Sequence, residues 1–556
     1  MIKMANKRGV VLVVSLIVMT ILLVLTGVYF LSLMTEKKSA DSEEFTLQAL
    51  GLAEAGANQG VSELRKRIRV DLLNNISVFT QGSVIKAYVT NNDSLGLLRD
   101  YAYGAGQPQF VVSSGQATVA VSALNLNTAV SGNYNATIIV TANGNPSNPS
   151  GEIYLFPYKY TIDSIGTITR QTPNIQKRTR LLQGVFTLTV RRDTFAKYAL
   201  FTSHHSTPSG TTVWFTNTTN FTGPVSTNTR FSFRNNPSGH FTEEASQHET
   251  KARFYNNGLT ILLNADSNPP NDVPVFDNGF TRGADIMNLE SSVSQADLKK
   301  EALGTLSNPG SNGIYVPNNG TILTGGVYIV GNSSVSMGLG TNNNPVYTIT
   351  QGATTKIVTV DYANNQTKIQ TGSVTETYQG IPDGESNIGT LIYAKDNINN
   401  FSGTVQKNTA LTVSSERDIV ITNHVQYQEY TSSPLSASGY NNLLGILSWG
   451  GNVRIGTSAP NNINIHGVVM APHGVFTVDN YNSGSARGTA TLLGGAITDF
   501  YGPFGTVSGA GYGRNFVYDA RMLQGMAPPY FPYLTNFTSF DNGGLDNKLV
   551  WQDKGV

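Results

Sequence analysis

The sequence predicts a mainly β protein with one long α-helix at its N-terminus. Three observations support this fold class. An apolar run near the N-terminus continues as a helical pattern; many short runs rich in Val, Ile, Thr and Tyr follow it; and 56 glycines, with abundant Asn and Ser, supply turns between those runs. With 556 residues, of which 39% are hydrophobic, the chain can bury a substantial core.

The N-terminus combines a short basic leader with a long apolar segment. Lys3, Lys7 and Arg8 precede Gly9, and an almost unbroken apolar run extends over residues 10–34. About 20 such residues cross a bilayer as a helix, and the preceding positive charge predicts a cytoplasmic N-terminus. A cleaved secretory signal fits less well, because its apolar region is roughly 7–15 residues long. A plain signal anchor is the simplest alternative.

Helical character continues beyond the apolar run. The residues that keep one helical face apolar or small are Phe45, Ala49, Leu52, Ala53, Gly56, Val61 and Leu64. We therefore predict a helix over residues 10–75, on the order of 90 Å long. Its first part, 10–34, is the transmembrane segment, and the remainder is amphipathic.

Residues 76–195 predict a first globular layer, in which an antiparallel sheet follows the helix. Its strand-like runs are 109–113, 117–122, 136–142, 158–164 and 181–191. Turns rich in Asn, Pro and Gly separate these runs, which is typical of short strands in an antiparallel sheet.

From residue 196 the pattern changes to short apolar runs flanked by Gly or Asn, and from Leu443 their spacing becomes regular. Residues 463–471 and 490–497 resemble coils of a parallel β-helix, in which alternate residues face a narrow core. We therefore predict a β-solenoid-like domain over 196–520, with a β-sandwich as the structural alternative. Residues 521–556, rich in Met, Pro and aromatic residues at their start, are expected to form a C-terminal cap or tail over the β-domain.

The sequence carries no recognisable catalytic motif. It has no cysteine, and Ala252 stands where a zincin motif beginning at His248-Glu249 needs its second histidine. We find neither a phosphate-binding loop nor a nucleophile elbow. The sequence therefore predicts a protein that is not an enzyme and that uses no cofactor or metal.

Two groups of basic residues stand out although the net charge is only +1. The first group, near the expected junction of the two β regions, consists of Lys177, Arg178, Arg180, Arg191 and Arg192. The second group consists of Arg230, Arg234, Lys251 and Arg253, interleaved with Phe231, Phe233, Phe254 and Tyr255. Cations beside aromatic rings are typical of single-stranded nucleic-acid binding, so both groups are candidate DNA-binding residues. The simpler interpretation is an ordinary strand surface, because alternation would bury the phenylalanines.

The leader, with Arg8-Gly9 before a long apolar segment, resembles the class III leader of type IV pilins. Residues 48–56 resemble the alanine- and glutamate-containing segment of minor pilins of the PilX type. This resemblance implies cleavage between Gly9 and Val10 by prepilin peptidase and N-methylation of Val10. It also implies a single-pass inner-membrane stage before assembly with other pilins through the helix.

The sequence departs from the family pattern at two positions. Val10 replaces the usual phenylalanine at the first mature position, and Val14 replaces the usual glutamate at the fifth. In the family that glutamate is thought to pair with a neighbour's terminal amine inside the filament, and an unpaired buried charge costs several kcal/mol. A subunit without the carboxylate is best placed at the tip, so we expect a minor, tip-located pilin.

The length of the chain and stretches such as 313–319 and 447–456 resemble large competence-associated pilins of the ComZ type. This resemblance implies a pilin head carrying a large parallel β-helix, display at the cell-surface pilus tip after passage through the periplasm, and binding of extracellular DNA during natural transformation. Two other functions stay open: a pilus-tip adhesin or assembly-priming minor pilin, and a pseudopilin of a type II secretion system.

Overall fold

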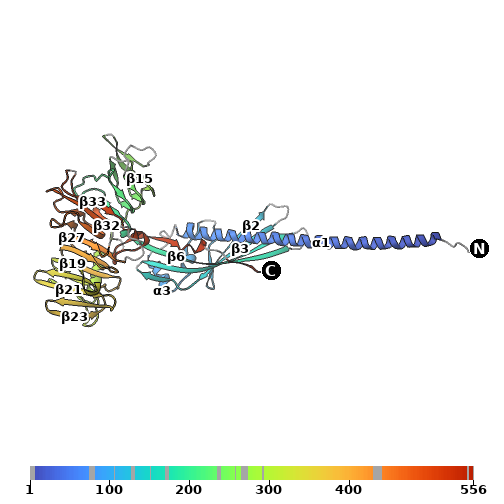
Figure 1. Ribbon diagram of the computed structural model, residues 1–556, viewed down its shortest axis with the longest axis horizontal. Coiled ribbons are helices and arrows are strands. Elements are labelled where there is room, and N and C mark those ends of the chain that lie inside the picture. The colour runs from blue at the N-terminus through green and yellow to red at the C-terminus, as the bar shows by residue number, and fades with distance from the viewer. Residues whose placement is uncertain are drawn as a thin grey trace, which may run out of the picture. The chain divides into compact units, whose positions relative to one another are not determined.

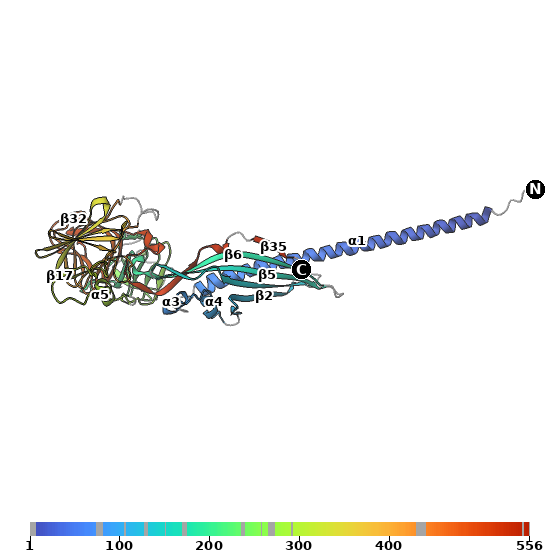
Figure 2. The same cartoon turned by 90° about the horizontal axis from the view of Figure 1, so that it is seen from below.

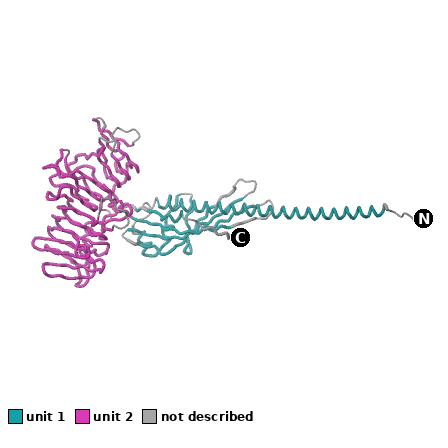
Figure 3. Tube along the Cα trace, viewed as in Figure 1, with its two compact units in different colours: residues 1–191, 537–556 teal, residues 192–536 magenta. Residues whose placement is uncertain are grey.

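The computed structural model shows a mainly β protein that divides into two compact units (Figure 3). Unit 1 contains residues 1–191 together with 537–556, and unit 2 contains residues 192–536. The residues that the structure describes are 7–73, 82–104, 107–126, 132–150, 152–169, 175–234, 239–256, 258–264, 273–290, 293–429, 441–506, 508–546 and 550–554.

Unit 1 begins with the long helix α1 (Lys7–Arg65), which continues into a π-helical segment, η1 (Lys66–Leu73) (Figure 1). The apolar side chains of residues 10–34 are exposed, including Leu23 at 71%. The helix is long and apolar enough to cross a membrane, as expected for a single-pass anchor or a signal segment near the N-terminus.

Three hydroxyl groups in the apolar part of α1 donate hydrogen bonds within the helix. Thr20 and Thr26 each donate a hydrogen bond, 2.6 Å long, to the carbonyl oxygen four residues earlier, and Ser15 donates to Leu12 at 3.0 Å. These side chains therefore bring no unsatisfied donor into an apolar environment.

The second part of α1 packs on an eight-stranded sheet (Figure 2). Its central order is β1-β2-β3-β5-β6-β34, with β4 beside β5 and β35 beside β6. The strands are β1 (Val111–Ser113), β2 (Gln116–Leu126), β3 (Gly132–Ala142), β4 (Ser147–Ser150), β5 (Ile153–Thr169), β6 (Ile175–Thr194), β34 (Tyr533–Asp541) and β35 (Val550–Lys554). Two short helices, α3 (Gly82–Thr90) and α4 (Gly96–Asp100), follow η1. All five strand-like runs expected between 109 and 191 overlap strands of this sheet.

The packing of helix on sheet depends on small residues. Ala49, Ala53 and Ala57 of α1 are fully buried, and Gly166 of β5 lies directly beneath the helix backbone. A Cβ atom at Gly166 would lie 2.6 Å from the amide nitrogen of Ala53. The helix can approach the sheet this closely only because both surfaces are nearly flat there.

The C-terminal residues return to unit 1. β34 and β35 both pair with β6, and η5 (Gly544–Asp546) follows β34. Arg69 of η1 forms ion pairs with Asp541 at 2.9 Å and with Asp546 at 2.6 Å. The structure therefore differs from the expected cap over 521–556, because the described residues from 537 onward belong to unit 1 and extend its sheet through β34 and β35.

Unit 2 is built around a long ladder of parallel strands. In spatial order the ladder contains β18 (Val327–Val330), β24 (Thr390–Ala394), β26 (Ala410–Ser415), β28 (Leu443–Ser448), β30 (Asn464–Ala471), β32 (Ala486–Phe500), β7 (Leu200–His204), β9 (Val225–Thr227), β12 (Ala245–Gln247) and β16 (Phe280–Arg282). The first strand of the unit, β7, therefore pairs with the late strand β32. The pieces 463–471 and 490–497, singled out in the sequence, are parallel neighbours in β30 and β32.

One column of apolar residues runs through this ladder. Its members, each the register partner of the next, are Val327, Ile392, Val413, Ile446, Val469, Ala496, Leu200, Val225, Ala245 and Phe280. Parallel strands are about 4.8 Å apart, so these side chains stack in van der Waals contact. Every residue of β28 is buried, as expected for strands covered on both faces.

The remaining strands complete the walls of unit 2. A second parallel ladder contains β19 (Ser333–Leu339), β25 (Ile398–Val405), β27 (Ile419–Tyr427), β29 (Val453–Ile455) and β31 (Phe476–Val478), and β33 (Gly511–Val517) pairs with β32. Antiparallel strands β20 (Pro345–Gln351), β21 (Thr354–Asp361), β22 (Gln366–Thr371) and β23 (Val374–Gln379) extend β19, and β17 (Gly313–Tyr315) pairs with β18. Small parallel sets are β8 (Asn220–Phe221), β11 (His240–Phe241) and β15 (Val275–Phe276), and β10 (Ser232–Arg234) with β13 (Ala252–Asn256). β14 (Leu259–Leu263) is antiparallel to β13. The described helical segments of unit 2 are the α-helix α5 (Gln295–Leu303) and the short 3-10 helices η2 (Phe195–Lys197), η3 (Thr341–Asn343) and η4 (Ala520–Gln524).

Unit 2 extends from residue 192 to residue 536, whereas the sequence predicts a β-domain over residues 196–520. Residues 521–536 belong to unit 2, where the Thr412 hydroxyl donates a hydrogen bond to the carbonyl of Pro529 and Phe531 is buried. This segment lies against β26 and β28, because Gly445 of β28 faces the side chains of Pro528 and Phe531. The first part of the expected cap thus does pack on the β-domain.

Candidate nucleic-acid interface

The candidate processing site lies in the first turns of α1. Gly9 and Val10 are both helical and exposed, and Val14, one turn later, is 53% exposed. No acidic residue lies in the first turn of the helix. The apolar surface that follows has no partner within the described part of the chain, so it is available for lipid or for other helices.

The first basic group does not form one cluster. All five residues lie on the single strand β6, and Arg180 is eleven positions from Arg191. At about 3.3 Å per residue, Arg180 and Arg191 are roughly 35 Å apart. The side chains of Lys177 and Arg178 lie outside the described residues, although their backbone is part of β6. The five residues that the sequence groups together are therefore divided in space, because an extended strand separates the segment 177–180 from Arg191 and Arg192.

The described arginines of this group have partners within the protein. Arg180 forms an ion pair with Glu54 of α1 at 2.9 Å. Arg191 lies 5.2 Å from the ring centre of Phe540, and the Arg192 Nε donates to the carbonyl of Leu534 at 2.9 Å. These contacts hold the helix and the C-terminal strand to the sheet, which is a structural role.

The second basic group comes together on one small sheet of unit 2. β10 and β13 are parallel neighbours, with Phe233 opposite Phe254 and Arg234 opposite Tyr255. Because side chains alternate along a strand, Phe233 and Phe254 face the core, where both are fully buried. Arg234 and Tyr255 share the other face, and the Arg234 guanidinium lies 4.3 Å from the ring centre of Tyr255.

Trp214 extends this face, although no pattern in the sequence singled it out. Its ring contacts Tyr255 edge-on, with the ring centres 6.0 Å apart. Trp214 precedes Phe215, which forms a parallel bridge with Phe233 and so places residues 213–216 beside β10. We define the basic-aromatic face as Trp214, Arg234, Lys251, Arg253 and Tyr255.

The four basic residues of the group differ in their availability. Lys251 and Arg234 are exposed. Arg253 is partly buried and donates to the Thr212 hydroxyl at 3.0 Å. Arg230 forms an ion pair with Glu249 at 2.9 Å and donates to the carbonyl of Lys251 at 2.7 Å, so its charge is largely balanced. We therefore leave Arg230 out of the basic-aromatic face.

Such a surface suits sequence-independent contact with a single strand. Aromatic rings stack on bases, and neighbouring cations neutralise phosphates without reading the sequence. Arg234 stacked on Tyr255 offers both a positive charge and a planar platform.

Comparison with known proteins gives one partial match. A family model described as a domain of unknown function (DUF4900) matches residues 154–247. The matched stretch begins in β5, includes the whole of β6 and ends at β12, so it contains the first passage of the chain from unit 1 to unit 2. No curated protein and no solved structure matches the chain.

Proposed function

We propose that this protein is a minor, tip-located subunit of a type IV pilus that binds extracellular DNA for uptake in natural transformation. The observation that carries the proposal is the organisation of α1. Its first part exposes an apolar surface that suits a membrane and then a filament core, and its second part packs on an antiparallel sheet through buried alanines. Arg8-Gly9 immediately before the apolar segment is the leader pattern of pilins.

Val14 supports the tip position. Its apolar side chain cannot pair with the terminal amine of a neighbouring subunit, and burying an unpaired charge in a filament core is costly. The proposed protein therefore needs no subunit ahead of it. Immunogold labelling along whole pili, instead of at their ends, would contradict this position.

Unit 2 is the proposed displayed head. We infer that its parallel ladders form a β-solenoid, because the apolar column passes through ten strands in continuous register. Solenoids present long, regular side walls to solvent, which suits binding of an extended ligand.

Processing of the leader tests the pilin assignment. We expect prepilin peptidase to cleave between Gly9 and Val10 and the new terminal amine to carry one methyl group, as measured by mass spectrometry of the isolated protein. A Gly9→Val variant should remain uncleaved in the inner membrane. Gly27→Ala, an open position on the same helix, is the matched control and should be processed normally. A mature protein that retains residues 1–9 would contradict the assignment.

DNA retention tests the ligand. Full-length protein in detergent should bind single-stranded DNA with an affinity that falls as salt rises, because phosphate contacts release counterions. Replacing Arg234, Lys251 and Arg253 together by glutamine should lower the slope of log K against log salt by about 2, at about 0.7 per lost contact. Arg230→Gln is the control, since its ion pair with Glu249 predicts a smaller change. Salt-insensitive binding, or none, would overturn the DNA proposal.

A further inference from the structure

Unit 2 contains a groove beside the basic-aromatic face. It has a volume of about 480 Å³ and is lined by residues within two segments, 207–221 and 501–516, far apart in the sequence. We call it the 501–516 groove. Its size is within the range of pockets for small ligands, roughly 300–1,000 Å³.

Hydroxyl groups form much of the lining. The polar side chains that contribute are Thr207, Thr216, Thr218, Thr219, Thr506 and Asn220. Several are already held in place: the Thr216 and Thr218 hydroxyls are 3.1 Å apart, and the Asn220 Oδ1 accepts from the His240 backbone at 3.0 Å. Each threonine hydroxyl can both donate and accept, and the Asn220 amide nitrogen can donate. Such a lining suits a ligand with many hydroxyl groups.

Two aromatic residues border the groove, and Trp214 provides the flat wall because Tyr512 is only 4% exposed. Trp214 and Tyr512 both line the groove, and the Tyr512 hydroxyl is fixed by donation to the Pro460 carbonyl at 2.8 Å. Trp214 is partly buried, and its edge-on contact with Tyr255 fixes the orientation of its ring. A rigid ring with an accessible face packs well against the C–H face of a sugar ring.

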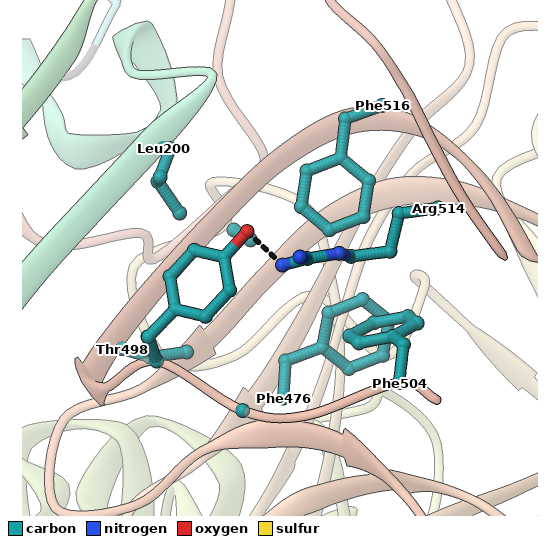
Figure 4. A pocket seen from close by; sticks show the side chains of 9 residues that line it. Leu200, Phe476, Thr498, Phe504, Arg514 and Phe516 are labelled. Atoms are coloured by element: carbon teal, nitrogen blue, oxygen red, sulfur yellow. Dashed lines mark hydrogen bonds between the residues drawn. The ribbon is translucent and has the colours of Figure 1, made fainter. Parts of the chain in front are cut away.

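Arg514 of β33 is the cation of the groove. No aspartate, glutamate or lysine is among the lining residues. Figure 4 shows Arg514 from the side of a smaller neighbouring pocket, where its guanidinium lies between Phe504 and Phe516, and it donates to the Tyr501 hydroxyl. Within the described residues it has no carboxylate partner, and the residue is exposed to solvent. An accessible cation without a counterion is complementary to an anionic group on a ligand.

We propose that the 501–516 groove binds an acidic polysaccharide, with a sugar ring on Trp214, sugar hydroxyls on the threonines and a uronate carboxylate on Arg514. A nucleic acid suits the groove less well, because every nucleotide brings a phosphate and the lining offers one cation. The site is separate from the proposed DNA surface except for Trp214, and it does not depend on DNA binding.

Calorimetry on full-length protein in detergent tests the proposal with two probes: trigalacturonate and the same trisaccharide with its carboxylates reduced to alcohols. We expect the acidic probe to bind about 10- to 100-fold more tightly, as for a charge-assisted hydrogen bond. Arg514→Gln should remove this preference and leave binding of the reduced probe nearly unchanged. Trp214→Ala should weaken both probes.

Arg417→Gln is the matched control, because Arg417 is an exposed arginine of unit 2 outside the groove and its loss changes the net charge equally. It should bind both probes as the wild type does. The proposal is overturned if neither probe binds, if Arg514→Gln keeps the preference for the acidic probe, or if Arg514→Gln loses single-stranded DNA as strongly as trigalacturonate. If Arg514→Gln does not fold, equal affinity of the wild type for the two probes still overturns it.

Discussion

At the scale of single residues, two buried histidines, His205 and His466, make the stability of unit 2 depend on pH. His205 is only 4% exposed among the rings of Phe215, Phe231 and Tyr501, and burial together with the charge of Arg514 lowers its pKa to about 3. Burial likewise lowers the pKa of His466 to about 4, and its Nδ1 accepts a hydrogen bond from the Tyr427 amide at 3.0 Å. Both rings are therefore neutral in the folded protein at ordinary pH.

Acid should destabilise unit 2 through these rings. A histidine with a depressed folded pKa contributes stability above its unfolded pKa of about 6.5, and that stability is lost as the pH falls toward the folded value. The loss is up to about 1.4 kcal/mol per pH unit for each ring. We expect the unfolding free energy of the wild type to fall from pH 6.5 to pH 4, and that of His205→Phe to fall less, as measured by urea unfolding. Equal slopes for the two proteins would contradict this explanation.

Asp383 provides a control, because its contribution to the unfolding free energy changes with pH in the opposite direction to that of the histidines. Desolvation raises its pKa to about 6, so the folded protein binds this proton more tightly than the unfolded chain. This residue therefore favours folding at low pH, and its contribution is lost as the pH rises through about 6. Asp383→Asn should steepen the acid loss of stability that His205→Phe makes shallower.

At the scale of elements, the contact between α1 and β5 is set by glycine. The Gly166 position is crowded by backbone atoms of Ala49 and Ala53, which cannot rotate away as a side chain could. Gly51, on an exposed face of the same helix, has nothing within 4 Å of its Cβ position. The two glycines therefore have different roles: Gly166 lies in the contact between helix and sheet, and Gly51 lies on the exposed side of the helix.

Alanine substitution should separate these roles. Gly166→Ala should push the helix from the sheet and cost about 1–3 kcal/mol, as overpacking does. Gly51→Ala should stabilise the helix by about 0.5–1 kcal/mol, because alanine loses less backbone entropy. Thermal unfolding, with hydrogen exchange of residues 49–73, measures both effects. A Gly166→Ala protein with unchanged exchange would show that the helix is not held by this contact.

Helices and strands could be predicted from the sequence where the pattern that indicates them lies within one continuous segment. The helix was predictable because apolar residues recur at helical spacing through Leu64 without an intervening proline. The parallel pairing of β30 with β32 was suggested by similar short apolar runs in neighbouring stretches. The ion pair between Arg230 and Glu249 was not predictable from the sequence, because Glu249 lies on another segment that only the fold brings near.

At the scale of the whole molecule, the features that escaped prediction are those that join distant residues. No local pattern indicates that residues 537–556 return to the sheet of unit 1, since Arg69 and Asp541 are separated by most of the chain. The 501–516 groove was missed for the same reason, because Trp214 and Arg514 meet only through the pairing of β7 with β32. The local elements of each unit could therefore be predicted from the sequence more readily than the contacts that join distant segments.

That return of the C-terminus has a mechanical consequence. The chain passes from unit 1 to unit 2 at residue 192 and back again after residue 536, through β6 and β34, which are neighbours in one sheet. A tensile load on unit 2 is therefore shared by two strands of the sheet in unit 1. A protease that cuts at residue 192 would not release unit 2, because β34 and β35 would still tether it to the sheet.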